Sequence, residues 1–460
     1  MDDHLPVEPQ GLNIVDCDQL SRRGFLRAGG LAIGAATLND AFSTDLQAST
    51  RRLKVAAIFT EFTHRSHANV ILENFLHPYL FNGKRTEPGM DVVSFYADQM
   101  PLEEMSRDVS QQFNIPLFKT IDEALCLGGK ELAVDAVLSI GEHGEYPTND
   151  LGQKEYPRKR FFDEIVAVMK RSGRFVPLFS DKHLSYRWDW AKEMYETAIK
   201  YGIPLMAGSS VPLAQRKPML DLPTDCEIEE AVSIHGGPLE IYDFHGLEVL
   251  QSMIEFRKGG ETGVTRVEFL DGDALWKAAD EGRWSREIAE QAMIAERGNR
   301  EGNLTNFDGE EADDPYGILL TYQDGTRATI LNLGKSSGRW NFACRLKGSP
   351  DIRATHFNVG PWNNRNLFKA LSHAIQHHFR EGSAPYPIER TLLTTGILEA
   401  AMRSRKQGTA LDTPHLEFGY NPIDFCAMRE MGDSWKIITD ELPEPKGIDT
   451  SGLTLKPLSP

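Results

Sequence analysis

The chain has no apolar run of the roughly 20 residues that a transmembrane helix requires, although it extends over 460 residues. It also has no excess of basic residues, since 50 Lys and Arg stand against 67 Asp and Glu, for a formal net charge of −17. General nucleic-acid binding needs a basic face, so this balance argues against it. The composition instead favours a soluble protein with a small-molecule or neutral substrate.

Cysteine is scarce and forms no motif. Cys126, Cys226, Cys344 and Cys426 lie far apart, with no C-x-x-C pair and no histidine at metal-ligand spacing. We therefore expect mostly buried apolar cysteines and no metal site. The sequence also lacks a G-x-S-x-G nucleophile elbow and a Walker phosphate loop. The motifs that mark α/β-hydrolases and P-loop NTPases are therefore absent.

Residues 1–50 are typical of an export signal rather than of a folded domain. The pair Arg22-Arg23 precedes a short, weakly hydrophobic stretch, Ala28 to Leu38, that is rich in glycine and alanine. This pattern resembles a bacterial twin-arginine signal. It predicts export through the twin-arginine machinery to the periplasm or cell envelope. Because this route carries folded proteins, it also favours a cofactor that is loaded before export.

Strands and helices alternate from residue 52 to about residue 212. Apolar runs at Leu53–Phe59 and Val134–Ile140 predict strands that are covered on both faces. Residues His67–Leu80 predict a helix with Ser66 as its N-cap. Repeated βα units with short connections indicate a doubly wound, Rossmann-like parallel sheet, which binds ligands at the carboxyl ends of its strands.

Lys182 lies at one of these carboxyl ends. Residues Phe175–Phe179 predict a buried strand, Ser185–Tyr201 an amphipathic helix and Ile203–Ala207 a second buried strand. The polar turn before the helix holds Lys182, which makes this lysine the strongest single catalytic candidate. A solvated loop lysine is the alternative, because most lysines are exposed.

The second half of the chain predicts an α+β domain with an open, mainly antiparallel sheet. Period-two alternation marks its strands, and Asp324-Gly325 is a hairpin signal. The strands are expected at 226–235, 264–270, 317–322, 327–333 and 340–346, with helices at 244–257, 285–297, 367–380 and 388–406. The chain is thus divided into a signal and linker (1–50), a Rossmann-like domain (51–215), a substrate domain (216–414) and a C-terminal tail (415–460).

This succession of two sheets, with Lys182 at a strand end, resembles the Gfo/Idh/MocA oxidoreductases from Arg52 to about Pro414. The family carries Glu-Lys-Pro where this chain has Asp181-Lys182-His183, and its closing helix resembles Gly396–Thr413. More narrowly, the chain resembles an exported, planctomycete-like bacterial group. The resemblance implies a dinucleotide-binding domain that takes NAD or NADP, and a sugar-like substrate. It is also compatible with a homo-oligomer.

The turn after the first strand departs from this family. Where the family has G-x-G-x-x-G, residues Thr60 to His67 contain no glycine, and those glycines let the backbone approach the pyrophosphate. A phosphate could instead be held at the helix N-terminus by Thr60, Arg65 and Ser66, while Glu61 would repel it.

The family often places an Asp and a His four residues apart on the helix that faces the nicotinamide. His245 matches the His, but Ile241 stands at the acid position, and the acid is displaced to Asp243 or to Glu240. The resemblance implies that His245 takes a proton from a sugar hydroxyl near Lys182 as hydride leaves the same carbon. A helix-start histidine bonded to its own backbone is the alternative.

Two more strand ends carry candidate cofactor-binding residues. Asp98 ends the second strand, where an acid bonds the adenine ribose and favours NAD over NADP; a turn or cap residue is the simpler interpretation. Glu142 and His143 follow the fourth strand, in the loop that lies beside the nicotinamide in the family. This loop could also ligate a metal, but a polar loop that supports the pocket is preferred.

The segment Asn358–Arg365, NVGPWNNR, is the last candidate. A ring such as that of Trp362 stacks on the apolar face of a sugar while amides bond its hydroxyls, so the segment suits sugar recognition. A Gly-Pro turn with a packed tryptophan is the alternative.

Three function classes remain open on these observations. The first is an exported NAD(P)-dependent oxidoreductase that acts on a sugar, polyol or glycoside, with a tightly bound cofactor recycled within the site. The second is a non-catalytic carbohydrate-binding or assembly protein that kept the fold and lost the cofactor, which the missing glycines favour. The third is a metal-dependent hydrolase or isomerase built around Glu142, His143 and Lys182.

Overall fold

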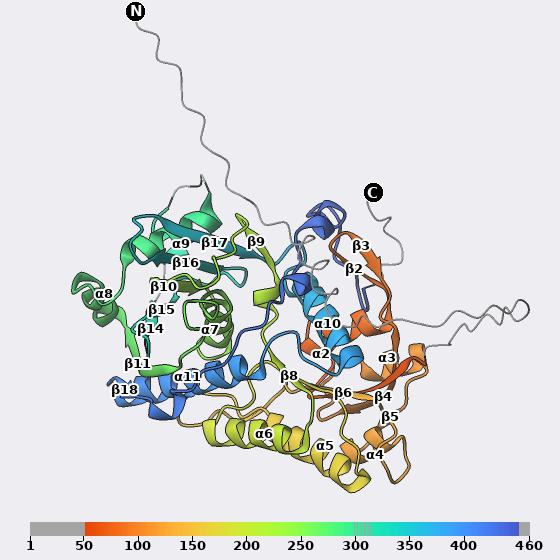
Figure 1. Cartoon of the computed structure of the whole chain (residues 1–460). Helices are drawn as coiled ribbons and strands as arrows, with labels where there is room; N and C mark the ends of the chain where they lie inside the picture. The colour runs from red at the N-terminus through yellow and green to blue at the C-terminus, as the bar shows by residue number, and fades with distance from the viewer. Residues whose placement is uncertain are drawn as a thin grey trace, which may run out of the picture. The chain divides into compact units, whose positions relative to one another are not determined.

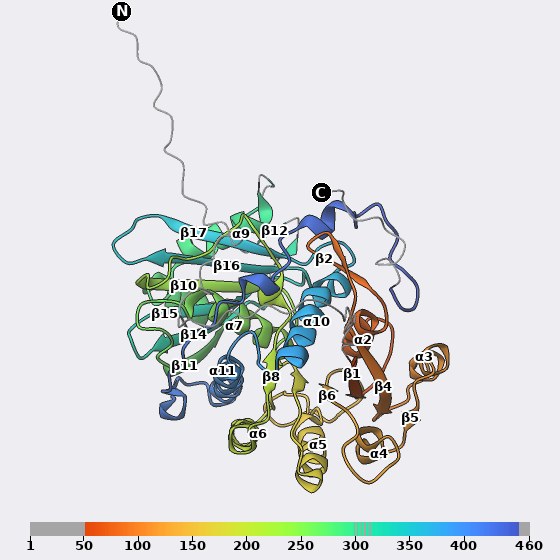
Figure 2. The same cartoon turned by 45° about the vertical axis from the view of Figure 1, so that its right-hand side comes forward.

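Two β-sheets and the helices between them organise the described part of the chain, as Figures 1 and 2 show. The computed structural model describes residues 51–298, 300, 302–304, 306–307, 310–311 and 314–449. The predicted export signal lies outside these residues.

The first sheet is parallel throughout and has six strands in the order β5-β4-β1-β6-β7-β8. The strands are β1 (Leu53–Phe59), β4 (Met90–Ala97), β5 (Leu117–Phe118), β6 (Ala136–Ile140), β7 (Leu178–Asp181) and β8 (Leu205–Gly208). Chain order reverses between β1 and β6, and in a doubly wound sheet the ligand crevice opens outside the carboxyl ends at this point. The predicted Rossmann-like sheet is confirmed.

The helices of this half are α2 (His67–Leu76), α3 (Ser106–Phe113), α4 (Ile121–Cys126), α5 (Arg158–Ser172) and α6 (Trp188–Tyr201). Ser66 caps α2 as predicted, because its side chain accepts the N–H of Asn69. The helix ends at Leu76 rather than at Leu80, since the residue before Pro78 is driven out of the helical conformation. The chain then forms a hairpin of β2 (Tyr79–Phe81) and β3 (Lys84–Thr86) that the sequence analysis missed.

The second sheet has eight strands in the order β18-β11-β14-β15-β10-β16-β17-β9. It is mainly antiparallel, as predicted, but β10 pairs with β15 in parallel. Its strands are β9 (Gln215–Lys217), β10 (Ile228–His235), β11 (Val264–Asp271), β14 (Tyr316–Tyr322), β15 (Arg327–Asn332), β16 (Trp340–Leu346), β17 (Ile352–Asn358) and β18 (Leu411–Asp412). The hairpin at Asp324-Gly325 is confirmed. The analysis missed β9, β17 and β18, and a separate pair of short strands, β12 (Asn306–Phe307) and β13 (Glu310–Glu311).

The helices of the second half are α7 (Ile241–Ile254), α8 (Gly272–Asp280), α9 (Arg286–Arg297), α10 (Asn364–Glu381) and α11 (Ile388–Gln407), of which α8 was not predicted. Of these, α7, α8, α9 and α11 pack on the second sheet. Helix α9 packs on β10, β16 and β17, whereas α7 and α11 pack on the face toward the first sheet. Helix α11 also contacts α6 and β8, and α10 lies beside α2.

Apolar side chains of both sheets therefore meet in one core. The same cluster contains Phe59 and Leu138 from the first sheet and Phe244 and Ile330 from the second half. The described residues from Arg52 onward belong to one compact unit. The expected division at residues 215 and 414 stays a prediction.

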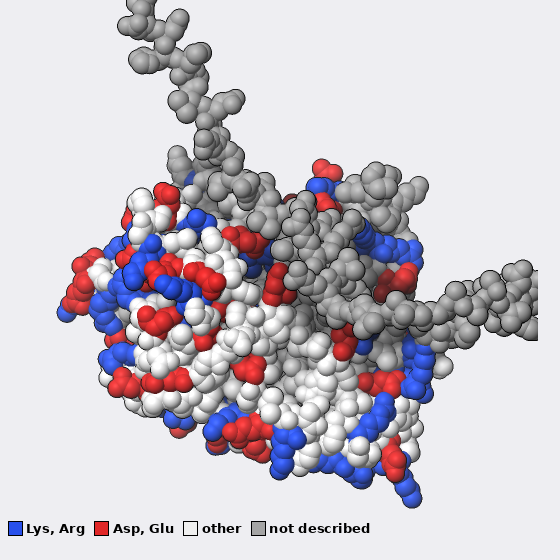
Figure 3. Space-filling view, in the orientation of Figure 1, with Lys and Arg blue, Asp and Glu red and all other residues white. Residues whose placement is uncertain are grey.

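The distribution of surface charge and the hydropathy of the helices can be compared with the expectations drawn from composition. On the face seen in Figure 3, acidic and basic side chains of the described residues are interspersed rather than gathered by sign. No described helix combines the length and hydropathy needed to cross a membrane.

A buried ion pair joins α11 to α7. Arg390 is fully buried and donates to both carboxylate oxygens of Glu255, which also accepts the hydroxyl of Tyr420 at 2.9 Å. Because both charges are withdrawn from water, removing one partner leaves the other uncompensated.

We expect the substitution Arg390→Ala to lower the free energy of unfolding by about 3–5 kcal/mol. The matched control is Lys192→Ala, which breaks the exposed pair of Lys192 with Glu196 and should cost less than about 0.5 kcal/mol. Urea denaturation followed by circular dichroism measures both values. Equal effects of the two substitutions would contradict the structural role of the buried pair.

Candidate functional site

Thr60 joins the loops that follow β1 and β6, at the point where the order of the first sheet reverses. Its hydroxyl donates to the carbonyl of Glu142, and its N–H donates to the carbonyl of Ile140 at 3.1 Å. Thr60 is fully buried. Its hydroxyl is therefore already engaged in a hydrogen bond that joins the two loops. The phosphate-binding role predicted for Thr60 stays untested.

Lys182 follows β7 and reaches the start of α7, the helix that packs on the second sheet. Its Nζ donates to Glu142 Oε1 at 3.0 Å and to the carbonyl of Ile241, at the start of α7, at 3.4 Å. Only 3% of the residue is exposed, so it is not a solvated loop lysine. Its φ of +63° is unusual for a residue with a side chain. The surroundings hold this conformation, since the Lys182 carbonyl accepts the N–H of Gly208 at 3.1 Å.

Two carboxyl groups with opposite tendencies lie near this amine. Burial alone would raise the pKa of Glu142, but Lys182 and Arg158 outweigh it and hold the pKa well below its usual range. Burial, opposed in part by Arg158, raises the pKa of Glu240 to about 7. His183 contacts both Arg158 and Glu240. Its Nε2 lies 3.2 Å from the Arg158 guanidinium and 3.5 Å from Glu240 Oε1. The site therefore combines an ionised carboxylate with a carboxyl that keeps its proton up to neutral pH.

His245 lies on α7, one turn after Ile241. Its Nδ1 lies 2.6 Å from the hydroxyl of Ser209, which follows β8. Burial holds the pKa of His245 well below its ordinary value, and Lys182 lowers it further. The ring is therefore neutral near pH 7 and able to accept a proton. Lys182 and His245 thus lie one helical turn apart along the start of α7, since Lys182 bonds the carbonyl of Ile241. The catalytic roles predicted for them stay untested.

Two further imidazoles complete the cluster. His67, the first residue of α2, has Nδ1 2.6 Å from Asp181 Oδ2, and its ring centroid lies 4.9 Å from that of His143. Burial lowers the pKa of His143 to about 4. The Nε2 of His143 is buried and has no hydrogen-bond partner among the described residues, so it is available to a polar ligand.

Asp243 has a structural task in the same helix. Its carboxylate accepts the N–H of Glu240 at 2.6 Å, Nε2 of His235 at 2.9 Å and the hydroxyl of Tyr316 at 3.1 Å. With Glu240 it forms a capping box, which explains why α7 begins at Ile241 rather than at the expected Phe244. The catalytic role predicted for Asp243 stays untested.

Asp98 directly follows β4 and is engaged by three donors. The hydroxyls of Tyr96 and Tyr146 each lie 2.7 Å away, and Arg160 lies 2.6 Å away. Burial would raise the pKa of Asp98, but these donors outweigh it and lower the pKa. A ribose would have to compete with them, so the role of Asp98 in choosing between NAD and NADP stays a prediction.

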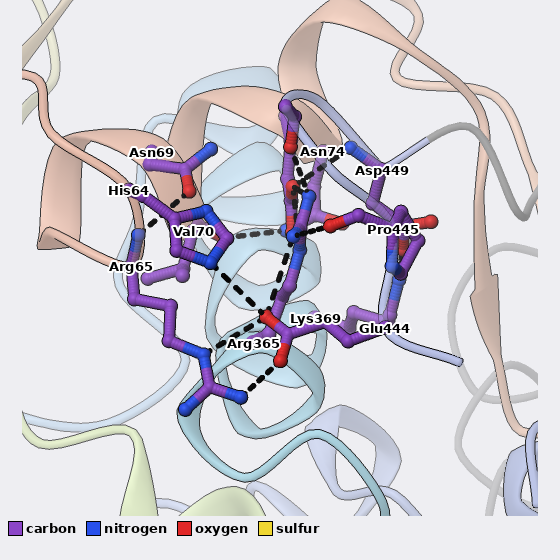
Figure 4. A network of polar contacts seen from close by, with 12 residues as sticks. His64, Arg65, Asn69, Val70, Asn74, Arg365, Lys369, Glu444, Pro445 and Asp449 are labelled. Carbon is purple, nitrogen blue, oxygen red and sulfur yellow. Dashed lines mark hydrogen bonds and ion pairs between the residues drawn. The ribbon is translucent and has the colours of Figure 1, made fainter. Parts of the chain in front are cut away.

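Arg65 holds an anion at the N-terminus of α2, but that anion belongs to the chain itself. Figure 4 shows the Glu444 carboxylate between Arg65, His64 and Arg365. Arg65 binds both carboxylate oxygens, with its Nε 2.9 Å from Oε1. Glu444 acts here as a stand-in for an oxyanion. The glycine-free turn thus contains groups that fit a phosphate, provided that it replaces this carboxylate.

Buried ion pairs anchor the segment around Glu444. Arg365 donates to Glu73 and to the carbonyls of Pro445 and Gly447, and Lys369 pairs with Asp449. The indole N–H of Trp362 donates to the carbonyl of Leu442 at 2.9 Å. Trp362 and Arg365 of the NVGPWNNR segment therefore hold the C-terminal tail, which supports the packed-turn alternative over sugar recognition.

A metal centre has no support in the described residues. They contain no group of three or more His, Cys, Asp or Glu side chains arranged to hold an ion. The carboxylate of Glu142 is instead engaged by Arg158 and Lys182.

Four buried members of the site were not among the predicted site residues. They are His67, Arg158, Asp181 and His183. Asp181 and His183 flank Lys182, and His67 follows the predicted N-cap, so their positions were visible in the sequence. Arg158 starts α5 and gave no local signal, because its role depends on a contact with a different loop.

Comparison with known proteins places the chain beside solved dehydrogenase structures. No protein-family model matches it, and no curated protein matches its sequence. It is similar to scyllo-inositol dehydrogenase from Lactobacillus casei, with 10% identity over 79% of this chain and 98% of that one and a TM-score of 0.49. A myo-inositol dehydrogenase from Corynebacterium glutamicum gives 14% identity, 79% and 99% coverage and a TM-score of 0.48.

A third similar structure is GenD2 from gentamicin A biosynthesis, solved in complex with NAD, with 13% identity, 83% and 99% coverage and a TM-score of 0.48. At such identities, and with TM-scores below 0.5, these likenesses carry no argument about the chemistry of this chain. The assignment of the fold depends instead on the strand order described above.

The raised pKa of Glu240 predicts a pH-dependent stability. Folded Glu240 keeps its proton to about pH 7, whereas the ordinary value is 4.5. Between these values the folded state binds more protons than the unfolded state, so stability falls as the pH rises. We expect Glu240→Gln to remove this loss. The unfolding free energy of the variant, taken relative to that of the wild type, should therefore rise by about 3 kcal/mol between pH 4.5 and pH 8.

Urea titrations at several pH values measure this difference. Glu229→Gln, at an exposed position, is the control and should follow the wild type at every pH. A constant difference between Glu240→Gln and the wild type across the range would show that Glu240 ionises in the folded state as an ordinary glutamate does.

Proposed function

We propose that this protein is an NAD(P)-dependent oxidoreductase that acts on a sugar, polyol or glycoside. The observation that carries the proposal is that Lys182 bonds the carbonyl of Ile241 at the start of α7, one helical turn before His245, so that both groups are buried between the first sheet and α7. A cationic amine beside a neutral imidazole suits removal of a proton from a hydroxyl group. The neighbouring buried imidazole of His143 offers a further unpartnered nitrogen to a polar substrate.

In this proposal each group has a separate task. Lys182 hydrogen-bonds the reacting hydroxyl and stabilises the negative charge that develops on its oxygen. His245, which its lowered pKa keeps neutral near pH 7, accepts the proton and is oriented by Ser209. Glu142 keeps the Lys182 amine in place. The nicotinamide, when bound, supplies the hydride acceptor.

The turn after β1 would hold the phosphates of the dinucleotide. This phosphate site would depend on Arg65 and on the N-terminus of α2, and Arg65 already holds the Glu444 carboxylate. The paired arginines Arg22-Arg23 support export by the twin-arginine route, and loading before export accords with a cofactor that is recycled within the site.

A second candidate is a carbohydrate-binding protein of the same fold that takes no cofactor. Two observations favour this second candidate. Glu444 occupies the position predicted for the phosphates, and Lys182 and Glu142 are each only 3% exposed. The experiments that follow separate the two candidates.

Release of a bound small molecule tests the presence of the cofactor. We expect denaturation of the full chain, followed by mass spectrometry, to yield NAD or NADP, or the purified protein to gain thermal stability when either is added. The absence of any nicotinamide together with a flat response to both dinucleotides would favour the non-catalytic candidate.

Substitution of Lys182 tests the chemistry. With NAD or NADP and scyllo-inositol or glucose as probes, we expect Lys182→Met to lower the rate of nicotinamide reduction by at least about 100-fold. His245→Asn should have an effect of the same order, whereas Lys192→Met, at an exposed site, should leave the rate unchanged. Full activity in Lys182→Met would rule out the proposed role of the amine.

Substitution of Glu444 tests the phosphate site. Glu444→Gln leaves Arg65 without its carboxylate partner, so we expect the Kd for NAD or NADP to fall by roughly tenfold. Glu441→Gln removes the same charge from an exposed position three residues earlier and should change the Kd little. Calorimetry measures both, and equal values for the two variants would place the phosphates elsewhere.

A further inference from the structure

A pair of neighbouring cavities lies further along the two loops that carry Glu142 and Lys182. Two cavities of about 520 and 570 Å³ share Asn149, Leu151 and Arg187 among their lining residues. They lie between the loop after β6, the start of α6, the second half of α11 and the short helix η2 (Pro414–Leu416). Each has the volume of a small-molecule site. We call the two cavities together the loop groove.

Aromatic rings line the loop groove and are held in place. Trp188 packs against Gly396 of α11, where an added Cβ would lie 2.8 Å from the indole ring, and it also stacks with Phe418. Trp190 packs edge-to-face with Tyr186, with ring centroids 5.3 Å apart. Rings that are fixed in advance lose little conformational entropy when a ligand stacks on them.

The charges in the first cavity already neutralise one another. Arg187 binds both carboxylate oxygens of Asp189, and Arg403 donates to Glu399 at 2.8 Å. The two arginines and two carboxylates that line this cavity therefore leave no net charge for an ionic ligand. This arrangement favours a neutral ligand with many hydrogen-bonding groups.

A buried amide in the same cavity has an unused donor. Gln153 is 1% exposed, and its Oε1 accepts from Asn149 at 3.2 Å, but its Nε2 has no partner among the described residues. An unsatisfied buried donor destabilises a folded protein. A ligand hydroxyl in the cavity would satisfy it.

From these observations we infer that the loop groove binds a neutral saccharide. A pyranose ring has a face of C–H groups that stacks on an indole and a rim of hydroxyl groups that bond to amides and paired charges. The groove supplies all three partners: Trp188 and Trp190, the amides of Asn149 and Gln153, and the two ion pairs. The inference needs no cofactor and so stands independently of the proposed reaction at Lys182.

Saccharide binding by the full chain, without any dinucleotide, tests the inference. The probes are cellotetraose, xylotetraose and maltotetraose, followed by calorimetry and by tryptophan fluorescence. We expect at least one of them to bind, and Trp190→Ala to weaken that binding by at least tenfold. Trp276→Ala removes an indole of α8 that lines neither cavity of the loop groove and should leave the Kd unchanged.

A second variant guards against an effect on folding alone. Gln153→Leu removes the unused amide donor, so we expect weaker saccharide binding with an unfolding midpoint at or above that of the wild type. Binding of none of the three probes, or binding that is insensitive to Trp190→Ala, would overturn the inference. Binding of a neutral Gly-Ser peptide in place of every saccharide would do so as well. None of these results bears on the dinucleotide release that tests the proposed function.

Discussion

The carboxylate of Glu142 is the interaction on which the candidate site depends. It neutralises Lys182 from the turn after β7 and Arg158 from the start of α5, and all three side chains are almost fully buried. Without it, two cations would face each other in a medium of low polarity, where uncompensated charge is costly. Its backbone carbonyl also accepts the Thr60 hydroxyl. One residue thus ties together three loops at the carboxyl edge of the first sheet.

This arrangement also explains how the two halves of the chain form one site. Lys182 reaches the first turn of α7, and the capping box of Glu240 and Asp243 sets where that helix begins. The start of α7 in turn places His245 beside Ser209. Buried pairs such as Arg390 with Glu255 and Arg365 with Glu73 bind the C-terminal helices to the rest of the molecule. The candidate site is therefore built from segments that are distant in the sequence.

Much of the fold could be predicted because it depends on local patterns. The apolar run of β1, the cap at Ser66 and the hairpin at Asp324-Gly325 each follow from short stretches of residues. Of the elements that were missed, β9 and β18 are held by pairing with β17 and β11, which lie far along the chain, whereas β17 also pairs with its neighbour β16. The end of α2 was placed too late, although Pro78 was visible, because the apolar periodicity continues through it.

The sequence by itself determined the class of fold, the position of Lys182 after a buried strand and the absence of glycine from the first turn. Only the tertiary structure decided which groups surround the lysine, that Asp243 caps a helix and that Arg65 is bound by Glu444. The physical reason is that backbone propensity acts over a few neighbouring residues. Pairing of buried charges depends instead on which loops the packed sheets and helices bring within a few ångströms.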